Sequence, residues 1–165
     1  MARILIVAGG CRGRGLAAAM LDEGHAVRIT TRSEEHAAAI EECGAECFVG
    51  SPQRLATMRA ALDGVTILCW LLATASGPRE DLQALHSTRL EFFLTQAIDT
   101  TVRGIVYESG GEGEQRALLA DGERRARAIA QRNAIPLQVL AADPARPEEW
   151  QGAARVAIAT LLAPA

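Results

Sequence analysis

The sequence contains no lysine, so its seventeen basic residues are all arginine. It has one tyrosine, Tyr107, and aromatic residues make up only 4% of the chain. These shortages restrict the chemistry available, because no mechanism that relies on a lysine beside a tyrosine can operate with these residues.

An excess of positive charge and a long apolar run are also missing. The net charge is −3, which gives no electrostatic reason to expect binding to nucleic acid or to an anionic membrane. No stretch approaches the length of a membrane span. The first apolar segment is too short for a signal peptide and ends in glycines, not at a cleavage site. We therefore expect a cytoplasmic protein that binds neither nucleic acid nor membrane.

The four cysteines, Cys11, Cys43, Cys47 and Cys69, form no C-x-x-C pair. The three histidines show no metal-ligand spacing with them. Cys43 and Cys47 flank Gly44, where a metal or redox site is one interpretation. The favoured interpretation is small apolar core residues in a reducing compartment, with no metal bound.

The chain of 165 residues is 49% apolar, which suits one globular domain over residues 1–165. Strand and helix patterns alternate, and this favours a parallel sheet with helices on both faces. The strands are expected at residues 4–8, 26–31, 46–49, 65–72, 102–107 and 135–141. The helices are expected at residues 13–23, after Ser33, from Ser51-Pro52 to Gly64, at 79–98, at 114–133 and from Pro147 onward.

The first strand runs directly into a glycine-rich turn and then into a helix. The turn has the spacing Gly9-x-x-x-Gly13-x-Gly15. Such a turn lets a pyrophosphate approach the backbone at a helix N-terminus, where free N–H groups favour an anion. The turn supplies these candidate cofactor-binding residues: Gly9, Gly10, Cys11, Arg12, Gly13, Arg14 and Gly15.

Three segments carry a resemblance to a known family. Residues 8–15 resemble the T-G-x-x-x-G-x-G segment of short-chain dehydrogenases/reductases, with alanine in place of threonine. Residues 24–32 and 61–65 are similar to segments of the epimerase/dehydratase branch. The resemblance implies a single doubly wound Rossmann domain, with six parallel strands in the order 3-2-1-4-5-6. It extends over the whole chain as a truncated domain that binds NAD(P).

The end of the second strand bears on the choice of cofactor. An acidic residue there binds the ribose of NAD, whereas a nearby arginine accommodates the 2′-phosphate of NADP. Thr31 stands where the acidic residue would be, and Arg32 follows it. Arg12 precedes the second glycine of the turn, a position from which a basic residue in this family also reaches the 2′-phosphate. We therefore expect NADP(H), with NAD as second choice; ordinary surface arginines are the alternative. The remaining candidate cofactor-binding residues are Ser33, Ser51 (where an aspartate usually approaches the adenine), Leu72 and Ala73.

The sequence departs from the family at its catalytic pair, Y-x-x-x-K. The matching positions fall near Leu119 and Glu123, and a carboxylate would raise a neighbouring phenol's pKa where a lysine would lower it. Tyr107 is expected on a strand. Ser109 could stand at the catalytic-serine position, although an ordinary turn after the strand is favoured.

Two classes of function follow. The favoured one is an NADP(H)-binding domain without the catalytic pair, which acts in nucleotide sensing or as a scaffold. The alternative is a small NADPH-dependent reductase in which the protein only positions the substrate against the nicotinamide. A methyltransferase-type Rossmann domain is a weaker third hypothesis, and the lack of an acidic residue after the second strand counts against it.

Three further residue groups carry expectations. His86 and Arg89 are expected one turn apart on one helix, as solvated or interface side chains. Trp70 is expected in the core. In the family that the sequence resembles, the fourth and fifth helices often pair across a two-fold axis. The apolar residues Leu90, Phe92 and Phe93 of the fourth helix therefore predict a homodimer formed through these two helices.

Overall fold

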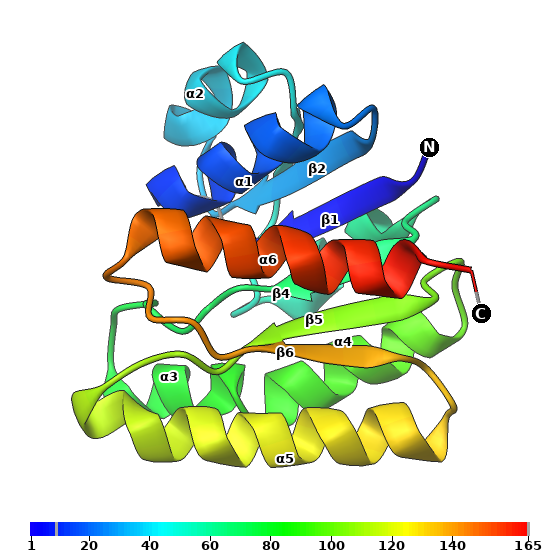
Figure 1. Cartoon of the computed structure of the whole chain (residues 1–165). Helices are drawn as coiled ribbons and strands as arrows, with labels where there is room; N and C mark the ends of the chain where they lie inside the picture. Colours follow the sequence, from blue (N-terminus) through cyan, green and yellow to red (C-terminus); the bar gives the residue numbers. More distant parts are fainter. Residues whose placement is uncertain (9, 165) are drawn as a thin grey trace.

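The computed structural model describes residues 1–8 and 10–164 and shows one parallel sheet between two layers of helices (Figure 1). The six strands lie in the order β3-β2-β1-β4-β5-β6, as the sequence predicts. Their bounds are β1 Arg3–Val7, β2 Ala26–Thr31, β3 Glu46–Val49, β4 Ile67–Trp70, β5 Gly104–Glu108 and β6 Leu137–Leu140.

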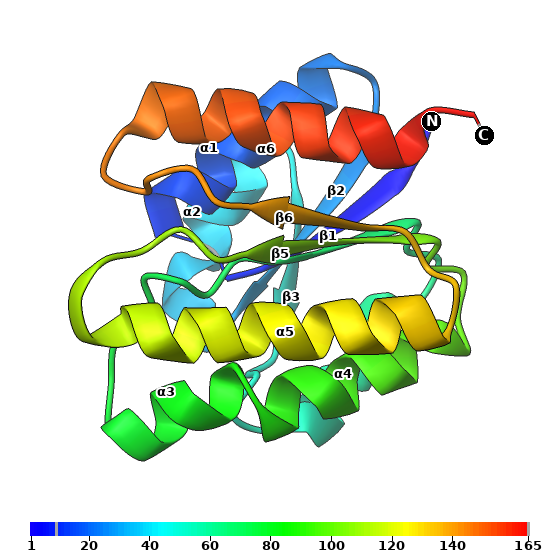
Figure 2. The ribbon, with the colours of Figure 1, turned by 60° about the horizontal axis from the view of Figure 1, so that its bottom comes forward.

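Helices cover both faces of the sheet (Figure 2). One face carries α1 (Gly10–Asp22), α2 (Ala37–Glu42) and α6 (Pro147–Leu162). The other carries α3 (Arg79–Leu85), α4 (Thr88–Ile98) and α5 (Arg116–Arg132). This arrangement confirms the expected doubly wound α/β fold.

Alternation along the strands divides the core into two layers. In β1, Ile4 and Ile6 face the layer of α1 and α6, whereas Leu5 and Val7 face the layer of α4 and α5. All four residues of β4 are fully buried, as expected for a central strand covered on both faces.

The helix expected from Ser51-Pro52 to Gly64 does not form. Its place is taken by two short 3-10 helices, η2 (Leu55–Thr57) and η3 (Arg59–Leu62). The Ser51 hydroxyl accepts a hydrogen bond from the Gln53 N–H within a tight turn, so it caps no α-helix. The apolar residues that suggest a helix here are nevertheless core residues, because Met58 and Leu62 are buried.

The single helix expected at residues 79–98 is instead two helices, α3 and α4, separated at His86 and Ser87. The break brings His86 inward, where its Nδ1 lies 2.8 Å from the Tyr107 hydroxyl. Other boundaries differ by smaller amounts. Helix α1 begins three residues earlier than expected, and a 3-10 turn, η4 (Gly113–Gln115), precedes α5.

The surface bears on the expected homodimer. Leu90 and Phe93 are buried within the chain, and Phe92 is 53% exposed. The apolar surface on α4 is therefore narrower than the sequence predicts. Among the described residues, no helix is both long enough and apolar enough to cross a membrane.

Candidate functional site

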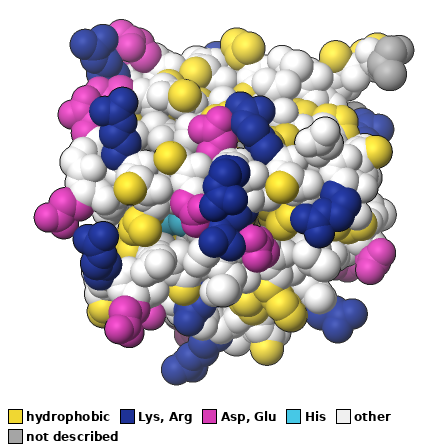
Figure 3. Space-filling view, turned by 90° about the horizontal axis from the view of Figure 1, so that it is seen from below, with side chains coloured by type: hydrophobic (Ala, Val, Ile, Leu, Met, Phe, Trp, Pro, Cys, Tyr) yellow, Lys and Arg dark blue, Asp and Glu magenta, His cyan; other side chains and the backbone are white. Residues whose placement is uncertain are grey.

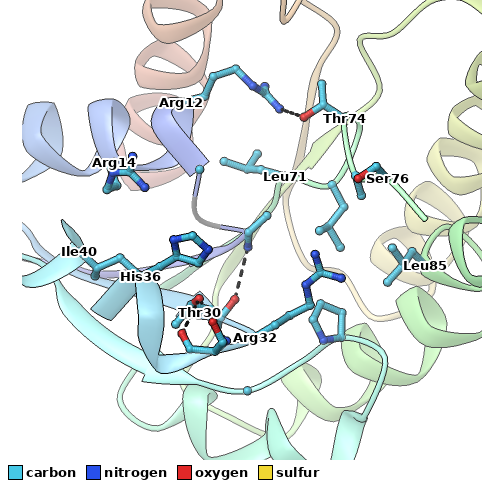
Figure 4. A pocket seen from close by; sticks show the side chains of 18 of the residues that line it. Arg12, Arg14, Thr30, Arg32, His36, Ile40, Leu71, Thr74, Ser76 and Leu85 are labelled. Atoms are coloured by element: carbon cyan, nitrogen blue, oxygen red, sulfur yellow. Dashed lines mark hydrogen bonds between the residues drawn. The ribbon is translucent and has the colours of Figure 1, made fainter. Parts of the chain in front are cut away.

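A cavity of about 810 Å³ lies at the carboxyl ends of β1, β2, β3 and β4. Open parallel sheets bind ligands at this edge, where the strand order reverses. In this sheet the reversal lies between β1 and β4. The close-up shows lining side chains contributed by α1, by the loop after β2 and by the loop after β4 (Figure 4).

The N-terminus of α1 opens onto the cavity. Gly10 and Cys11 are exposed there, and both line it. Ala8 has a φ of +93°, a region that side-chain-bearing residues seldom occupy, and Gly10 has a φ of +65°. Unusual backbone of this kind is concentrated at ligand-binding turns. The first N–H groups of a 13-residue helix have no intrahelical partner, so this end favours an anion.

The later glycines of the turn serve packing. A Cβ on Gly13 would lie 2.7 Å from the Ala8 carbonyl oxygen, so glycine is required for α1 to approach the end of β1. A Cβ on Gly15 would lie 3.2 Å from Gln151 on α6. Neither glycine lines the cavity. Gly9, also expected in the site, lies outside the described residues.

The end of β2 supplies a second wall. Thr31, Arg32 and Ser33 all line the cavity. The Thr31 hydroxyl donates a hydrogen bond to the Ser33 carbonyl at 3.1 Å, which shapes this turn. Arg32 is exposed, and His36 of the 3-10 helix η1 (Glu34–His36) extends the same wall (Figure 4).

The end of β3 contributes Pro52 and Gln53 in place of the expected Ser51, which does not line the cavity. The Gln53 side-chain oxygen is buried and has no hydrogen-bond partner among the described residues. A buried carbonyl oxygen without a donor is costly, so this atom is suited to accept a hydrogen bond from a ligand.

The end of β4 forms the apolar part of the cavity. Leu71 and Leu72 line it, together with Leu85 at the end of α3. Ala73, expected in the site, does not line it; its N–H donates instead to the Glu108 carboxylate at 2.9 Å.

Arg12 is the most highly engaged side chain at this edge. Its guanidinium donates to both oxygens of Glu108, at 2.5 and 3.3 Å, and to the Thr74 hydroxyl at 2.7 Å. It also lies 4.5 Å from the ring centre of Trp150, whose indole N–H donates to Glu108 at 2.6 Å. The guanidinium is therefore turned toward the carboxyl end of β5.

Arg12 and Arg32, which are expected to contact one phosphate, both line the cavity, but in this structure they are not brought together. In the close-up, Arg12 lies beside Thr74 at one end of the cavity and Arg32 lies at the other (Figure 4). The Glu108 carboxylate neutralises Arg12, since the two groups form a salt bridge that leaves the Glu108 side chain fully buried. Arg32, in contrast, remains exposed at the end of β2.

Tyr107 is fully buried on β5, beneath α5. Burial raises the pKa of its phenol, and the neighbouring Glu123 and Asp121 raise it further. Its partner His86 is 3% exposed, and burial lowers the pKa of that imidazole to about 4. His86 was expected at the surface, so that expectation is wrong. Neither side chain lines the cavity, and neither does Ser109.

The cysteines differ in exposure. Cys69 is buried, which raises the pKa of its thiol to about 12, and Cys43 and Cys47 pack against the core as expected. Cys11 is exposed on the cavity wall. Within residues 1–8 and 10–164, no three His, Cys, Asp or Glu side chains are grouped as metal ligands would be.

The sequence places Glu108 at the carboxyl end of the fifth strand but indicates neither its burial nor its partner Arg12, and it gives no role to Gln53. Strand periodicity could have placed Glu108 on the same face as Val106, toward α1 and α6, where a buried acid needs a basic partner. Gln53 gave no comparable signal, because the helix expected around it does not form.

Comparisons with known proteins identify the fold. No known family model matches the sequence, and no curated protein matches it. Solved structures do match. Vestitone reductase from alfalfa is 13% identical with a TM-score of 0.65, and the match covers 84% of this chain and 56% of that one.

Two further matches contain a nucleotide. A short-chain dehydrogenase/reductase superfamily protein from Agrobacterium tumefaciens with bound NAD is 21% identical, with a TM-score of 0.69 over 83% of this chain and 48% of that one. Triphenylmethane reductase from Citrobacter, complexed with NADP(H), is 23% identical, with a TM-score of 0.63 over 84% and 48%.

The matched region is thus about half the length of these three proteins. At such identities the likeness concerns the fold. The chain has the fold of the short-chain dehydrogenase/reductase and epimerase/dehydratase proteins, which the glycine turn and the strand order predict.

Proposed function

We propose that this chain binds NADP(H) in the cavity at the carboxyl ends of β1 to β4. The observation that carries the proposal is the charge of the lining. Among the described residues, Arg12, Arg14 and Arg32 line the cavity and no aspartate or glutamate does; Arg12 is paired with Glu108, so the unpaired positive charge comes from Arg14 and Arg32. With the N-terminus of α1 at the same place, the cavity favours an anionic ligand.

The parts of the cavity suggest how such a ligand lies. The pyrophosphate sits at the N-terminus of α1, beside Gly10 and Cys11. The 2′-phosphate lies against Arg32, which is exposed at the end of β2 and has no acidic residue at the preceding position. The adenine lies toward Gln53, whose unpaired oxygen accepts a hydrogen bond from the exocyclic amino group.

We propose further that the bound nucleotide serves sensing or scaffolding. Its support is the chain's lack of lysine and the burial of Tyr107, which leave no activated phenol at the cavity. The alternative is a small reductase. The apolar part of the cavity, formed by Leu71, Leu72 and Leu85, favours this alternative. The variant Tyr107→Phe distinguishes such a reductase from an enzyme that uses the family's catalytic tyrosine. A reductase that only positions its substrate should keep its turnover in this variant.

The test of the binding proposal is calorimetry with NADPH and NADH on the wild type and on Arg32→Ala. A charge-assisted hydrogen bond contributes about 1.5–3 kcal/mol, so the wild type should bind NADPH at least about tenfold more tightly than NADH. Arg32→Ala should bind the two cofactors equally. Arg103→Ala removes an exposed arginine at the opposite edge of the sheet and should keep the preference.

Two results would count against the proposal. Equal affinity of the wild type for both cofactors would remove the NADP preference. Absence of binding to either one would remove the dinucleotide function itself.

We also propose a homodimer in which the exposed Phe92 of α4 lies at the contact. Support comes from Phe92 itself, a large apolar side chain that is 53% exposed on α4. Next to it in the chain, Glu91 joins Arg125 and Asp121 in linked ion pairs. The space-filling view of this side of the molecule shows acidic and basic side chains next to one another (Figure 3). Location in the cytoplasm and lack of binding to nucleic acid stay predictions from composition.

A further inference from the structure

The carboxyl end of β5 is occupied by a group of four side chains, Arg12, Thr74, Glu108 and Trp150, hereafter the Arg12 cluster. Arg12 donates one hydrogen bond to Thr74 and binds both oxygens of Glu108. Its guanidinium lies over the Trp150 ring at 4.5 Å. Four segments meet here: the start of α1, the loop after β4, the end of β5 and α6.

The Arg12 cluster is held firmly. The Glu108 side chain is 0% exposed and accepts further hydrogen bonds from Ala73 N–H and from the Trp150 indole. Moving Arg12 away would leave a buried carboxylate without its cation, which is strongly unfavourable. Arg12 therefore forms a fixed part of the wall.

This wall limits the cavity on the side of β5. The lining comes from the ends of β1 to β4, from α1 and from Leu85 of α3. Within the described part of the chain, no residue of β5, β6 or α6 contributes to it. The hydrogen bond from Arg12 to Thr74 crosses between α1 and the loop after β4 at the cavity edge (Figure 4).

A dinucleotide on a doubly wound sheet lies across the switch point, one half on each side. The half over β2 and β3 has an open cavity here, with Arg32 and Gln53 in its walls. The other half would extend past β4 toward β5, where the Arg12 cluster stands.

We propose that the Arg12 cluster restricts this site to the adenosine half of NADP(H), so that the nicotinamide stays outside the protein. This rests on the proposed function and adds the part of the ligand that is recognised. Arg12 is then a specificity-determining residue, because it bounds the ligand and leaves the 2′-phosphate to Arg32. A nicotinamide held outside the protein has no fixed partner for hydride transfer, which accords with sensing or scaffolding.

The test is a titration of the wild type with three probes: NADPH, 2′-phospho-ADP-ribose and reduced nicotinamide mononucleotide. If the nicotinamide contributes no contact, NADPH and 2′-phospho-ADP-ribose should bind within about threefold of each other. The mononucleotide should show no saturable binding. The fluorescence emission of NADPH should keep its free-solution maximum when bound.

A double variant, Arg12→Met with Glu108→Gln, opens the wall without leaving a buried charge. In this variant the side-chain amide keeps an acceptor for only one of the two remaining N–H groups, because Ala73 and Trp150 donate to different oxygens of Glu108. In this variant we expect the affinity for NADPH to exceed that for 2′-phospho-ADP-ribose by at least about tenfold, and the emission maximum of the nicotinamide to shift on binding. Thr95→Val, on the outer face of α4, is a control that should change neither affinity.

The outcomes are distinct. Wild-type affinity for NADPH at least about tenfold above that for 2′-phospho-ADP-ribose would overturn this inference and leave the proposed function standing. Failure of both ligands to bind would overturn the proposed function and the inference with it. The wild-type titration decides the matter even if the double variant does not fold.

Discussion

Glu108 is a buried carboxylate that accepts hydrogen bonds from three segments of the chain. In the sequence it is an acidic residue at the end of an apolar strand, and this pattern predicts an exposed side chain. Strand alternation predicts which face it takes. The identity of its partner could not be predicted, because Arg12 lies 96 residues away and the pairing depends on how α1 enters the fold.

We expect Glu108→Ala to lower the free energy of unfolding by about 3–5 kcal/mol, because Arg12 loses its counterion and two N–H groups lose their acceptor. Glu108→Gln should cost less, since the amide keeps an oxygen for one of these two N–H groups, which donate to different oxygens of the carboxylate. Urea denaturation measures both. Glu114→Ala, at an exposed position, is the matched control, and equal losses for Glu108→Ala and this control would contradict the assignment.

His86 gives the fold a dependence on pH. Its pKa is lowered to about 4 by burial, although the Leu72 carbonyl partly offsets this effect. The folded state thus holds a neutral imidazole where the unfolded chain has an ordinary one. The stability that depends on the neutral ring is complete above about pH 6.5 and is lost as the pH falls toward 4.

The free energy of unfolding should fall by about 3 kcal/mol over this pH range because of His86, in addition to the decrease caused by protonation of the carboxylates. His86→Asn keeps an acceptor for the Tyr107 hydroxyl and cannot be protonated, so its stability should fall less over the same range. Denaturant titrations at several pH values compare the two proteins. Parallel curves for the wild type and His86→Asn would show that His86 does not carry the effect.

Among the elements, the strands followed their predicted ranges most closely, and β2 and β3 match them fully. The apolar strand patterns are local, so tertiary packing seldom changes them. The helices between residues 51 and 98 were less predictable. The break between α3 and α4 contains no proline or glycine. It coincides with the buried contact between His86 and Tyr107, which no local pattern reveals.

Gly122 shows a similar dependence on a distant residue. The sequence suggests a weak point in a helix, yet α5 is continuous through it. A Cβ there would overlap the Tyr107 hydroxyl, so glycine makes room for the tyrosine beneath α5.

We therefore predict that Gly122→Ala destabilises the protein by at least about 1–3 kcal/mol, because overpacking outweighs the better helix propensity of alanine. Adding Tyr107→Phe removes the overlapping oxygen and should recover part of the loss. Thermal unfolding of the two single variants and the double variant gives the coupling. Simple additivity of the two changes would contradict this account.

At the scale of the whole molecule, strand order and layer arrangement could be predicted because alternating strands and helices with right-handed crossovers permit few topologies. The outline of the site could be predicted as well, since ligands bind at the carboxyl edge of such sheets. Its inner details could not be predicted: Gln53 and His36 lie in short turns whose conformations have no strong local pattern, and the orientation of Arg12 depends on its distant partner Glu108.

Assembly is a further prediction at this scale. We expect light scattering to give the mass of a dimer at micromolar concentration, and Phe92→Glu to give a monomer, because the charge would be buried at the contact. Val156→Glu, on the opposite helical layer, should leave the dimer intact. A monomeric wild type would contradict the homodimer.

The central claim is that the cavity at the carboxyl ends of β1 to β4 binds NADP(H), and backbone NMR with added NADPH tests it most directly. The account predicts saturable shifts of the amides at Cys11, at Thr31 to Ser33 and at Gln53. Amides of the outer face of α4 and α5 should not move. Saturation without shifts at these cavity residues, or no saturable shift anywhere, would contradict it.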